Sequence, residues 1–254
     1  MINTDQRREE IISLIHENGK VRVSELSERY GISEVSIRKD LEVLEAEGHL
    51  SRVHGGAIGL NKLYVNMDLS ERFKTNALAK KKLADLAAQF IEDNDTIMMN
   101  AGTTLTYVLR AIRDKKNINI VTNSVQNATE AALYQNFNVI LLGGELDSKY
   151  QFTYGNDAIR QIENYHATKC ILSVDGISAS SGLSLYYSNE AALAKKMIEC
   201  SAKVIVTADS SKIGKDVFAK ICGASKTDVL VTTVSDNKDE ISALSKLGVK
   251  IFEA

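Results

Sequence analysis

Short polar turns follow several apolar segments of this 254-residue chain, and their residue types suit the binding of an anion. Gly102, Thr103 and Thr104 stand between an apolar segment and a helical pattern. Their backbone N–H groups and hydroxyls would therefore surround an anion at the N-terminus of a helix. Asn123 and Ser124 repeat the arrangement after the next apolar segment. Taken alone, a turn of this kind is more often a helix cap than a ligand site.

Further polar or glycine-rich positions follow the later apolar segments. These positions are Gly143, Gly144, Asp175, Gly176, Glu190 and Lys212. Glycine permits close backbone approach, lysine supplies positive charge and carboxylates accept hydrogen bonds from hydroxyl groups. Together the groups suit a small sugar phosphate. The alternative is structural: a tight turn for the glycine pair, a cap for the aspartate and a solvated surface charge for the lysine.

The elements that must position these turns alternate along the chain from residue 77 onward. Short apolar segments predict strands at 95–100, 117–123, 138–144, 169–176, 203–209, 228–233 and 249–253. Helical patterns lie between most of them, at about 77–91, 104–114, 125–134, 155–163, 189–201 and 237–247. This alternation predicts an α/β domain with a mainly parallel, covered sheet. Ligands bind such sheets at the carboxyl ends of the strands, where the polar turns would converge.

The first sixty residues predict a separate unit of three short helices followed by a hairpin. The second and third helices are joined by the tight turn at 30–33, which is typical of a helix-turn-helix. Ile37, Leu41 and Leu44 share one face of the third helix, and we expect that face to pack inward. The first two turns of this helix would then meet the edges of DNA bases.

The other faces of the third helix carry groups that DNA contacts require. Arg38 could read a guanine through O6 and N7, while Ser36 and Lys39 could hold phosphates. The hairpin places Arg52 and His54 beside a glycine pair, as expected for a wing that approaches the DNA backbone. The alternative is a dimerisation module with a solvated basic face. The net charge of the first sixty residues does not favour DNA binding over dimerisation, since they contain more carboxylates than basic groups.

Composition narrows the class of protein. The net charge is −2, and no apolar run approaches the length of a membrane span. The N-terminus lacks the pattern of a secretory signal, and the three cysteines form no CxxC pair. We therefore expect a reduced, cytoplasmic protein. The four histidines are scattered, so we expect neither a metal site nor a cofactor.

The N-terminal unit resembles the winged helix-turn-helix of the DeoR family of bacterial transcription regulators. The matching segments are RREEII (7–12), VRVSELSERYGIS (21–33), VSIRKDLEVLEAEGHLSR (35–52) and HGGA (54–57). The chain from about 76 to 233 resembles the effector domain of the same family in NAGTT, VTNS, LLGGEL, SVDGIS, NEAALAKKMIE and ADSSKIGKDVF. That effector fold is similar to ribose-5-phosphate isomerase and glucosamine-6-phosphate deaminase. Asn100 is a mild departure from the family, whose members commonly have Asp or another small polar residue there, so Asn100 is not counted among the expected ligand contacts.

The resemblance implies a DNA-binding domain at 1–58, a linker at 59–75 and a sugar-phosphate sensor, with an isomerase-like fold, at 76–254. The expected function is a repressor of a carbohydrate-utilisation operon, released from its operator by a phosphorylated sugar or sugar alcohol. A homo-oligomer, dimer or tetramer, is expected because one short helix reads too few bases.

Two other functions stay open from the residues alone. In a sugar-phosphate isomerase or deaminase, Asp175, Glu190 and Lys212 would supply the acid and the base for an enediol reaction. Against this, no histidine lies in the candidate turns, and the same groups bind a sugar without turnover. The other function is an oligomeric interaction module with a vestigial sugar pocket.

Overall fold

The structure is a computed structural model that describes residues 3–18, 20–46, 50–53, 55–59 and 67–254. The chain forms two compact units, Met1–Asp68 and Leu69–Ala254. Part of the expected linker at 59–75 is helical, since α5 (Leu69–Lys74) opens the second unit. No helix in the described part of the chain is long and apolar enough to span a membrane.

The first unit is a winged helix-turn-helix, as predicted. Its elements are α1 (Thr4–Asn18), β1 (Lys20–Arg22), α2 (Val23–Tyr30), α3 (Glu34–Ala46), β2 (Leu50–Val53) and β3 (Gly56–Gly59). The strands form an antiparallel sheet in the order β1-β3-β2, so the short extended segment before α2 pairs with the predicted hairpin. Gly31 ends α2 with a left-handed φ of 64°, a conformation that glycine adopts without strain.

Apolar side chains from all three helices form the core of the first unit. Ile37, Leu41 and Leu44 of α3 are buried, which confirms the predicted inward face. Asp40 shares this burial, and its carboxylate accepts hydrogen bonds from Arg7 Nε at 2.7 Å and Arg8 Nε at 3.0 Å. The ion pairs join α1 to α3 at a position that would otherwise hold an uncompensated buried charge.

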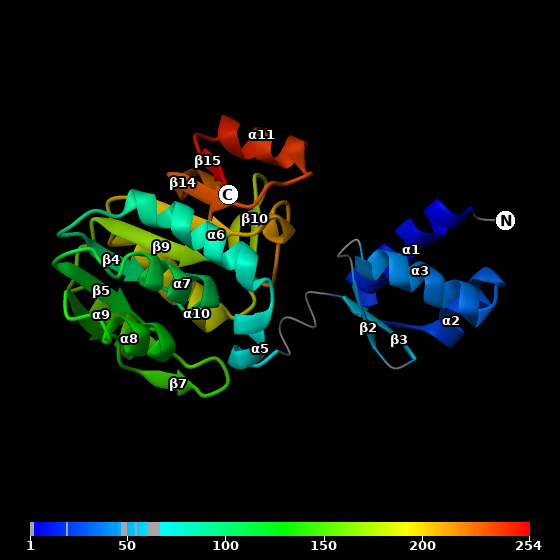
Figure 1. The fold of residues 1–254 in the computed structure, drawn as a ribbon, viewed down its shortest axis with the longest axis horizontal. Helices are drawn as coiled ribbons and strands as arrows, with labels where there is room; N and C mark the ends of the chain where they lie inside the picture. The colour runs from blue at the N-terminus through cyan, green and yellow to red at the C-terminus, as the bar shows by residue number, and fades with distance from the viewer. Residues whose placement is uncertain (1–2, 19, 47–49, 54, 60–66) are drawn as a thin grey trace. The chain divides into compact units, whose positions relative to one another are not determined.

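The second unit is built on a seven-stranded parallel sheet in the order β15-β14-β12-β9-β4-β5-β6 (Figure 1). Its strands are β4 (Thr96–Met99), β5 (Ile118–Thr122), β6 (Phe137–Leu141), β9 (Lys169–Ser173), β12 (Val204–Ala208), β14 (Val229–Thr232) and β15 (Lys250–Glu253). All seven predicted strands are confirmed. The chain proceeds from β4 towards β6 on one side and from β9 towards β15 on the other. The strand order therefore reverses between β4 and β9, the place where open α/β sheets bind ligands.

Helices cover both faces of the sheet, which confirms the predicted α/β class. They are α6 (Ala77–Ala87), α7 (Thr103–Ala111), α8 (Val125–Ala131), α9 (Asn156–Ile162), α10 (Ser188–Glu199) and α11 (Lys238–Lys246). Alternate residues of one strand face opposite layers. Thus Ile97 and Met99 pack with α6 and α7, whereas Met98 packs in the cluster that contains α9 and α10.

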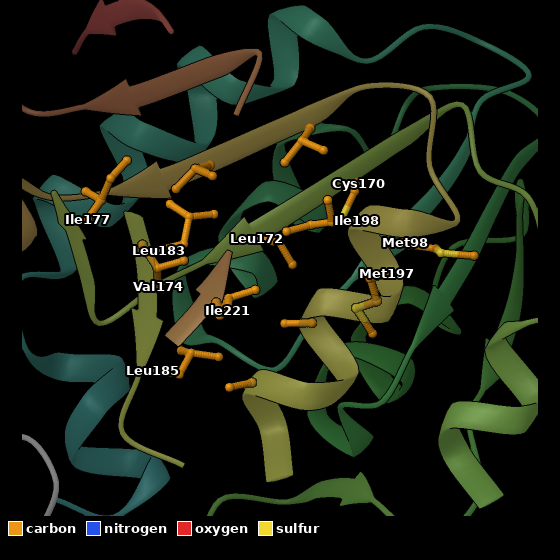
Figure 2. Packing of buried hydrophobic residues seen from close by; sticks show 14 of the residues in the cluster. Met98, Cys170, Leu172, Val174, Ile177, Leu183, Leu185, Met197, Ile198 and Ile221 are labelled. Atoms are coloured by element: carbon orange, nitrogen blue, oxygen red, sulfur yellow. The ribbon is translucent and has the colours of Figure 1, made fainter. Parts of the chain in front are cut away.

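A small antiparallel sheet completes the hydrophobic core of the second unit. This sheet was not predicted from the sequence. Its strands are β10 (Gly176–Ser178), β11 (Gly182–Leu185) and β13 (Ala219–Cys222). Figure 2 shows Leu183 of β11 and Met197 of α10 in the same cluster as Leu172 of β9. A second unpredicted pair, β7 (Glu145–Asp147) and β8 (Phe152–Tyr154), is also antiparallel. These short strands lack the continuous apolar run that marks the equally short β4 and β14, and they are too short to show a clear alternation of apolar and polar residues.

Candidate functional site

The start of α3 presents the groups expected to contact DNA. Val35 is 62% exposed, and the hydroxyl of Ser36 lies 3.0 Å from that of Ser33, within hydrogen-bond distance. Arg38 Nη2 donates a 2.7 Å hydrogen bond to Glu34 Oε2 one turn earlier. Lys39 is exposed and has no ion pair within the described part of the chain. DNA would therefore meet Lys39 directly but would have to compete with Glu34 for Arg38.

The wing holds Arg52 against the end of α3. Glu45 accepts hydrogen bonds from the backbone N–H of Arg52 at 2.7 Å and from its Nε at 2.8 Å. These bonds lower the pKa of Glu45, the backbone bond most and the side-chain bond next. Both side chains are partly exposed, so the guanidinium of Arg52 is accessible to solvent while the backbone of Arg52 is held in place by Glu45. His54 lies outside the described residues.

In the second unit, the polar turn after β4 meets the end of β9 and the start of α10 at the strand reversal. The side chain of Asn100, directly after β4, accepts a 2.9 Å hydrogen bond from Ser173 N and donates a 3.0 Å bond to Ser173 O. Its amide also donates to Glu190 Oε1 at 3.1 Å. Asn100 is buried, so it fixes the spacing between the ends of two strands and the start of α10.

The predicted anion-binding turn follows Asn100. Gly102 approaches Ser173 so closely that an added Cβ would lie 2.7 Å from the Ser173 Cβ. Thr103 and Thr104 begin α7 and are both buried. The Thr103 hydroxyl has no hydrogen-bond partner among the described residues. A buried hydroxyl without a partner is costly, and a ligand oxygen at this edge would satisfy it.

Two buried carboxyl groups lie beside this turn. Asp175 accepts a 3.1 Å hydrogen bond from Tyr186 N, and Gly176 lets the chain pass against the backbone of Lys215. Burial raises the pKa of Glu190 to about 8, and the negative charge of Asp175 adds to the effect. Glu190 is therefore largely protonated near neutral pH and can donate as well as accept a hydrogen bond.

Asn123 and Ser124 hold neighbouring elements together. Asn123 Nδ2 donates to the backbone O of Thr153 in β8 at 3.0 Å, and Ser124 Oγ caps α8 by accepting from Asn127 N. These hydrogen bonds within the protein therefore account for most of the polar atoms of the two side chains. The exception is Asn123 Oδ1, which is buried and has no partner among the described residues.

The glycine pair is likewise explained by packing. Gly143 N donates to Gln161 Oε1 at 2.8 Å, and a Cβ on Gly144 would lie 2.3 Å from the backbone O of Tyr154. Gly144 also has a positive φ of 138°. Both glycines therefore have structural roles beside β8 and α9, and their contact with a ligand stays a prediction.

Lys212 lies near Lys80, a buried cation that could not be singled out from the candidate turns. Lys212 follows Asp209, whose carboxylate caps a short 3₁₀ turn by accepting from Ser211 N at 2.9 Å. Lys80 on α6 is buried, and Lys212, Asp209 and Arg72 all affect its pKa electrostatically. One signal could have identified Lys80, because it shares the buried stripe of α6 with Leu83, Ala84 and Ala87.

Comparisons with known proteins agree with this architecture. Residues 7–62 match the family model described as DeoR-like helix-turn-helix domain, and residues 75–234 match DeoR C terminal sensor domain. The chain is 35% identical to the uncharacterized HTH-type transcriptional regulator YulB of Bacillus subtilis, over 97% of this chain and 95% of that protein. It is 30% identical to the glycerol-3-phosphate regulon repressor of Escherichia coli, over 89% and 90% of the two chains.

Among solved structures, ribose 5-phosphate isomerase A of Neisseria gonorrhoeae aligns with 52% of each chain, at 20% identity and a TM-score of 0.40. The two family models follow each other along the chain in the same order as the two units of the structure. Together they match most of its residues. The chain belongs to the DeoR family of transcriptional regulators.

Proposed function

We propose that the protein represses a carbohydrate-utilisation operon and leaves its operator when a phosphorylated sugar or sugar alcohol binds the second unit. One observation carries this proposal. The same chain joins a winged helix-turn-helix to a parallel sheet whose reversal point holds buried polar groups. Thr103 Oγ1 at this point and Asn123 Oδ1 at the end of the neighbouring β5 have no partner among the described residues. The relative that represses the glycerol-3-phosphate regulon supports a phosphorylated polyol as the class of effector.

On DNA, α3 would enter the major groove with its first two turns against the bases. Arg38 would read a base edge, while Ser36 and Lys39 would contact phosphates. Arg52 and His54 would approach the backbone from the wing. The ion pairs of Arg38 and Arg52 with carboxylates are exposed, and exposed pairs contribute little, so phosphates and bases can replace them at small cost.

In the sensor, the effector would lie over the ends of β4 and β9. The turn of Gly102, Thr103 and Thr104 would contact its phosphate or hydroxyl groups, and Asp175 and Glu190 would bind sugar hydroxyls. Asn123, Ser124, Gly143, Gly144, Gly176 and Lys212 complete the proposed effector site. Release of DNA requires the effector to favour the non-binding state by about 5.5 kcal/mol for a swing from 1:99 to 99:1.

We propose a homo-oligomer, dimer or tetramer, in the cytoplasm, because symmetric operators need two recognition helices. We further propose that the sheet edge binds its ligand without turning it over. Asp175 and Glu190 could serve as an acid–base pair, but the fused DNA-binding unit gives a sugar site a use that needs no catalysis.

Fluorescence anisotropy tests the DNA-binding part. Labelled fragments from upstream of the gene and its neighbours are titrated with the full chain, with a scrambled fragment as competitor. Binding of one fragment that the scrambled competitor fails to displace supports the proposal. Equal affinity for all fragments at moderate salt would contradict operator recognition, since phosphate contacts alone give sequence-independent binding.

A further inference from the structure

Val35, in the first turn of α3, is an apolar side chain that the core of the first unit does not use. It is 62% exposed, whereas Ile37, Leu41 and Leu44 of the same helix are buried. A valine on the surface of a helix also costs helix stability, because its branched side chain loses rotamer freedom there. Neither packing nor helix propensity therefore accounts for a valine at this position.

The groups around Val35 on the surface of α3 carry charge. Arg38 and Lys39 follow it by three and four positions, so the three side chains lie on one face of the helix. Both cations are exposed, and Glu34, the carboxylate of the same turn, is paired with Arg38. A partner protein would have to cover the cations together with the valine. DNA offers phosphates and base edges to the cations and an apolar methyl group to the valine, so DNA is the partner that fits this face.

The backbone beneath Val35 is held in place at the start of the helix. The hydroxyl of Ser33 accepts a 3.3 Å hydrogen bond from Ser36 N, and the backbone O of Ser33 accepts one from Ile37 N at 3.2 Å. A valine in a helix has one strongly preferred rotamer. The two methyl groups of Val35 therefore have a fixed direction before DNA binds, and a contact with DNA costs little side-chain entropy.

The major groove offers one apolar group to such a side chain, the 5-methyl group of thymine. Residues three positions apart are separated by about 4.5 Å along the axis of a helix, and successive base pairs by about 3.4 Å. These two spacings are similar. When Arg38 reads one base pair, Val35 therefore meets the adjacent base pair or the one after it.

We propose that Val35 determines operator specificity by contacting the 5-methyl group of a thymine next to the base pair that Arg38 reads. This proposal rests on the proposed function and deepens it, because it names a chemical feature of the operator. The contact removes apolar surface of both groups from water. Burial of one group of this size corresponds to a factor of about four in affinity.

Replacement of thymine by uracil tests the contact, because uracil lacks only the 5-methyl group. The full chain first selects its preferred sequence from a pool of random DNA duplexes. Each thymine of the selected sequence is then replaced in turn, and fluorescence anisotropy measures the dissociation constant. We expect one replacement in each half-site to raise the dissociation constant about fourfold. The sensitive thymine should lie within about two base pairs of the position at which Arg38→Ala relaxes base preference.

Val35→Ala should bind the thymine and uracil duplexes with dissociation constants that differ by less than about twofold. Because both duplexes are measured with both proteins, any effect of uracil on the DNA itself cancels. Val53→Ala is the matched control, since Val53 is an exposed valine of the same unit that lies on β2 of the wing. It should keep the fourfold difference. Circular dichroism verifies that both variants fold.

The proposal is overturned if no uracil replacement changes the affinity, or if folded Val35→Ala retains the difference that the wild type shows. In either case a defined selected sequence would leave the DNA-binding function standing. If the wild type selects no sequence at all, operator recognition fails and the proposal fails with it. Analytical ultracentrifugation tests the other possible partner: an oligomer that dissociates in Val35→Ala but not in Val53→Ala would place Val35 in a contact between copies and overturn the proposal.

Discussion

Asn100 and Glu190 are ninety positions apart in the chain, yet a 3.1 Å hydrogen bond joins the Asn100 amide to the Glu190 carboxyl group. The same amide donates to the backbone of Ser173, so the ends of β4 and β9 and the start of α10 meet at one side chain. Because the pKa of Glu190 is raised to about 8, this contact places a protonated carboxyl group beside the proposed effector site.

Glu190→Gln should reduce the pH dependence of stability. The pKa of the Glu190 carboxyl group rises on folding from 4.5 to about 8. The contribution of this group to the free energy of unfolding is therefore complete below pH 4.5. That contribution is lost as the pH rises through this window, by at most about 1.4 kcal/mol per pH unit. The variant should therefore lose stability less steeply as the pH rises. Urea unfolding at a series of pH values measures the slope.

Glu199→Gln serves as the control for this experiment, because Glu199 is an exposed carboxylate on the same helix. It should keep the slope of the wild type. A Glu190→Gln variant that also kept this slope would show that Glu190 does not titrate in this range.

Arg38→Ala should weaken operator binding by about 1–3 kcal/mol and relax base preference at one position, as expected when a base contact is lost. Glu34→Gln should not weaken binding, because it only frees Arg38 from its ion pair. Anisotropy with single-base variants of the operator measures both effects. Unchanged affinity and preference in Arg38→Ala would exclude Arg38 as a base-reading residue.

Lys39→Ala should lower affinity on every DNA sequence by a similar factor, because an exposed lysine at this position is expected to contact a phosphate. The slope of log affinity against log salt should decrease by about 1. Titrations at several salt concentrations measure it. A slope equal to that of the wild type would mean that Lys39 touches no phosphate.

Asp40→Ala should destabilise the first unit by about 3 kcal/mol, because it leaves two arginines without their buried partner. Arg7 and Arg8 retain partial exposure, which limits the loss. Urea unfolding of the full chain measures the change in the free energy of unfolding. Loss of DNA binding reports the unfolding of the first unit. Stability equal to that of the wild type would show that the pairing only orients α1 against α3.

The sequence predicted the sheet well because its strands are buried on both faces and therefore read as continuous apolar segments, as in β12 and β14. The positions of Gly102, Asp175 and Glu190 near the strand reversal followed from the same pattern. The contact between Asn100 and Glu190 could not be predicted from the sequence, because it depends on the order of the strands in the sheet. The buried position of Lys80 was missed because lysines are rarely buried.

Gly102→Val should abolish the response to the effector and leave operator affinity unchanged, because a side chain there would occupy the space of Ser173 at the end of β9. The first unit has a core of its own and does not use this turn. Anisotropy with and without effector measures both properties. Loss of both together would indicate general misfolding, which circular dichroism would reveal.

In the proposed regulator, binding of a phosphorylated sugar by the second unit controls operator binding by the first. The most direct test adds a panel of sugar phosphates, including glycerol 3-phosphate and ribose 5-phosphate, to the anisotropy assay of the protein–operator complex, with each unphosphorylated parent as its control. We expect one phosphorylated compound to weaken operator binding at least about tenfold, equivalent to about 1.4 kcal/mol, while its parent does not. Conversion of a sugar phosphate to product without any change in operator affinity would contradict this expectation.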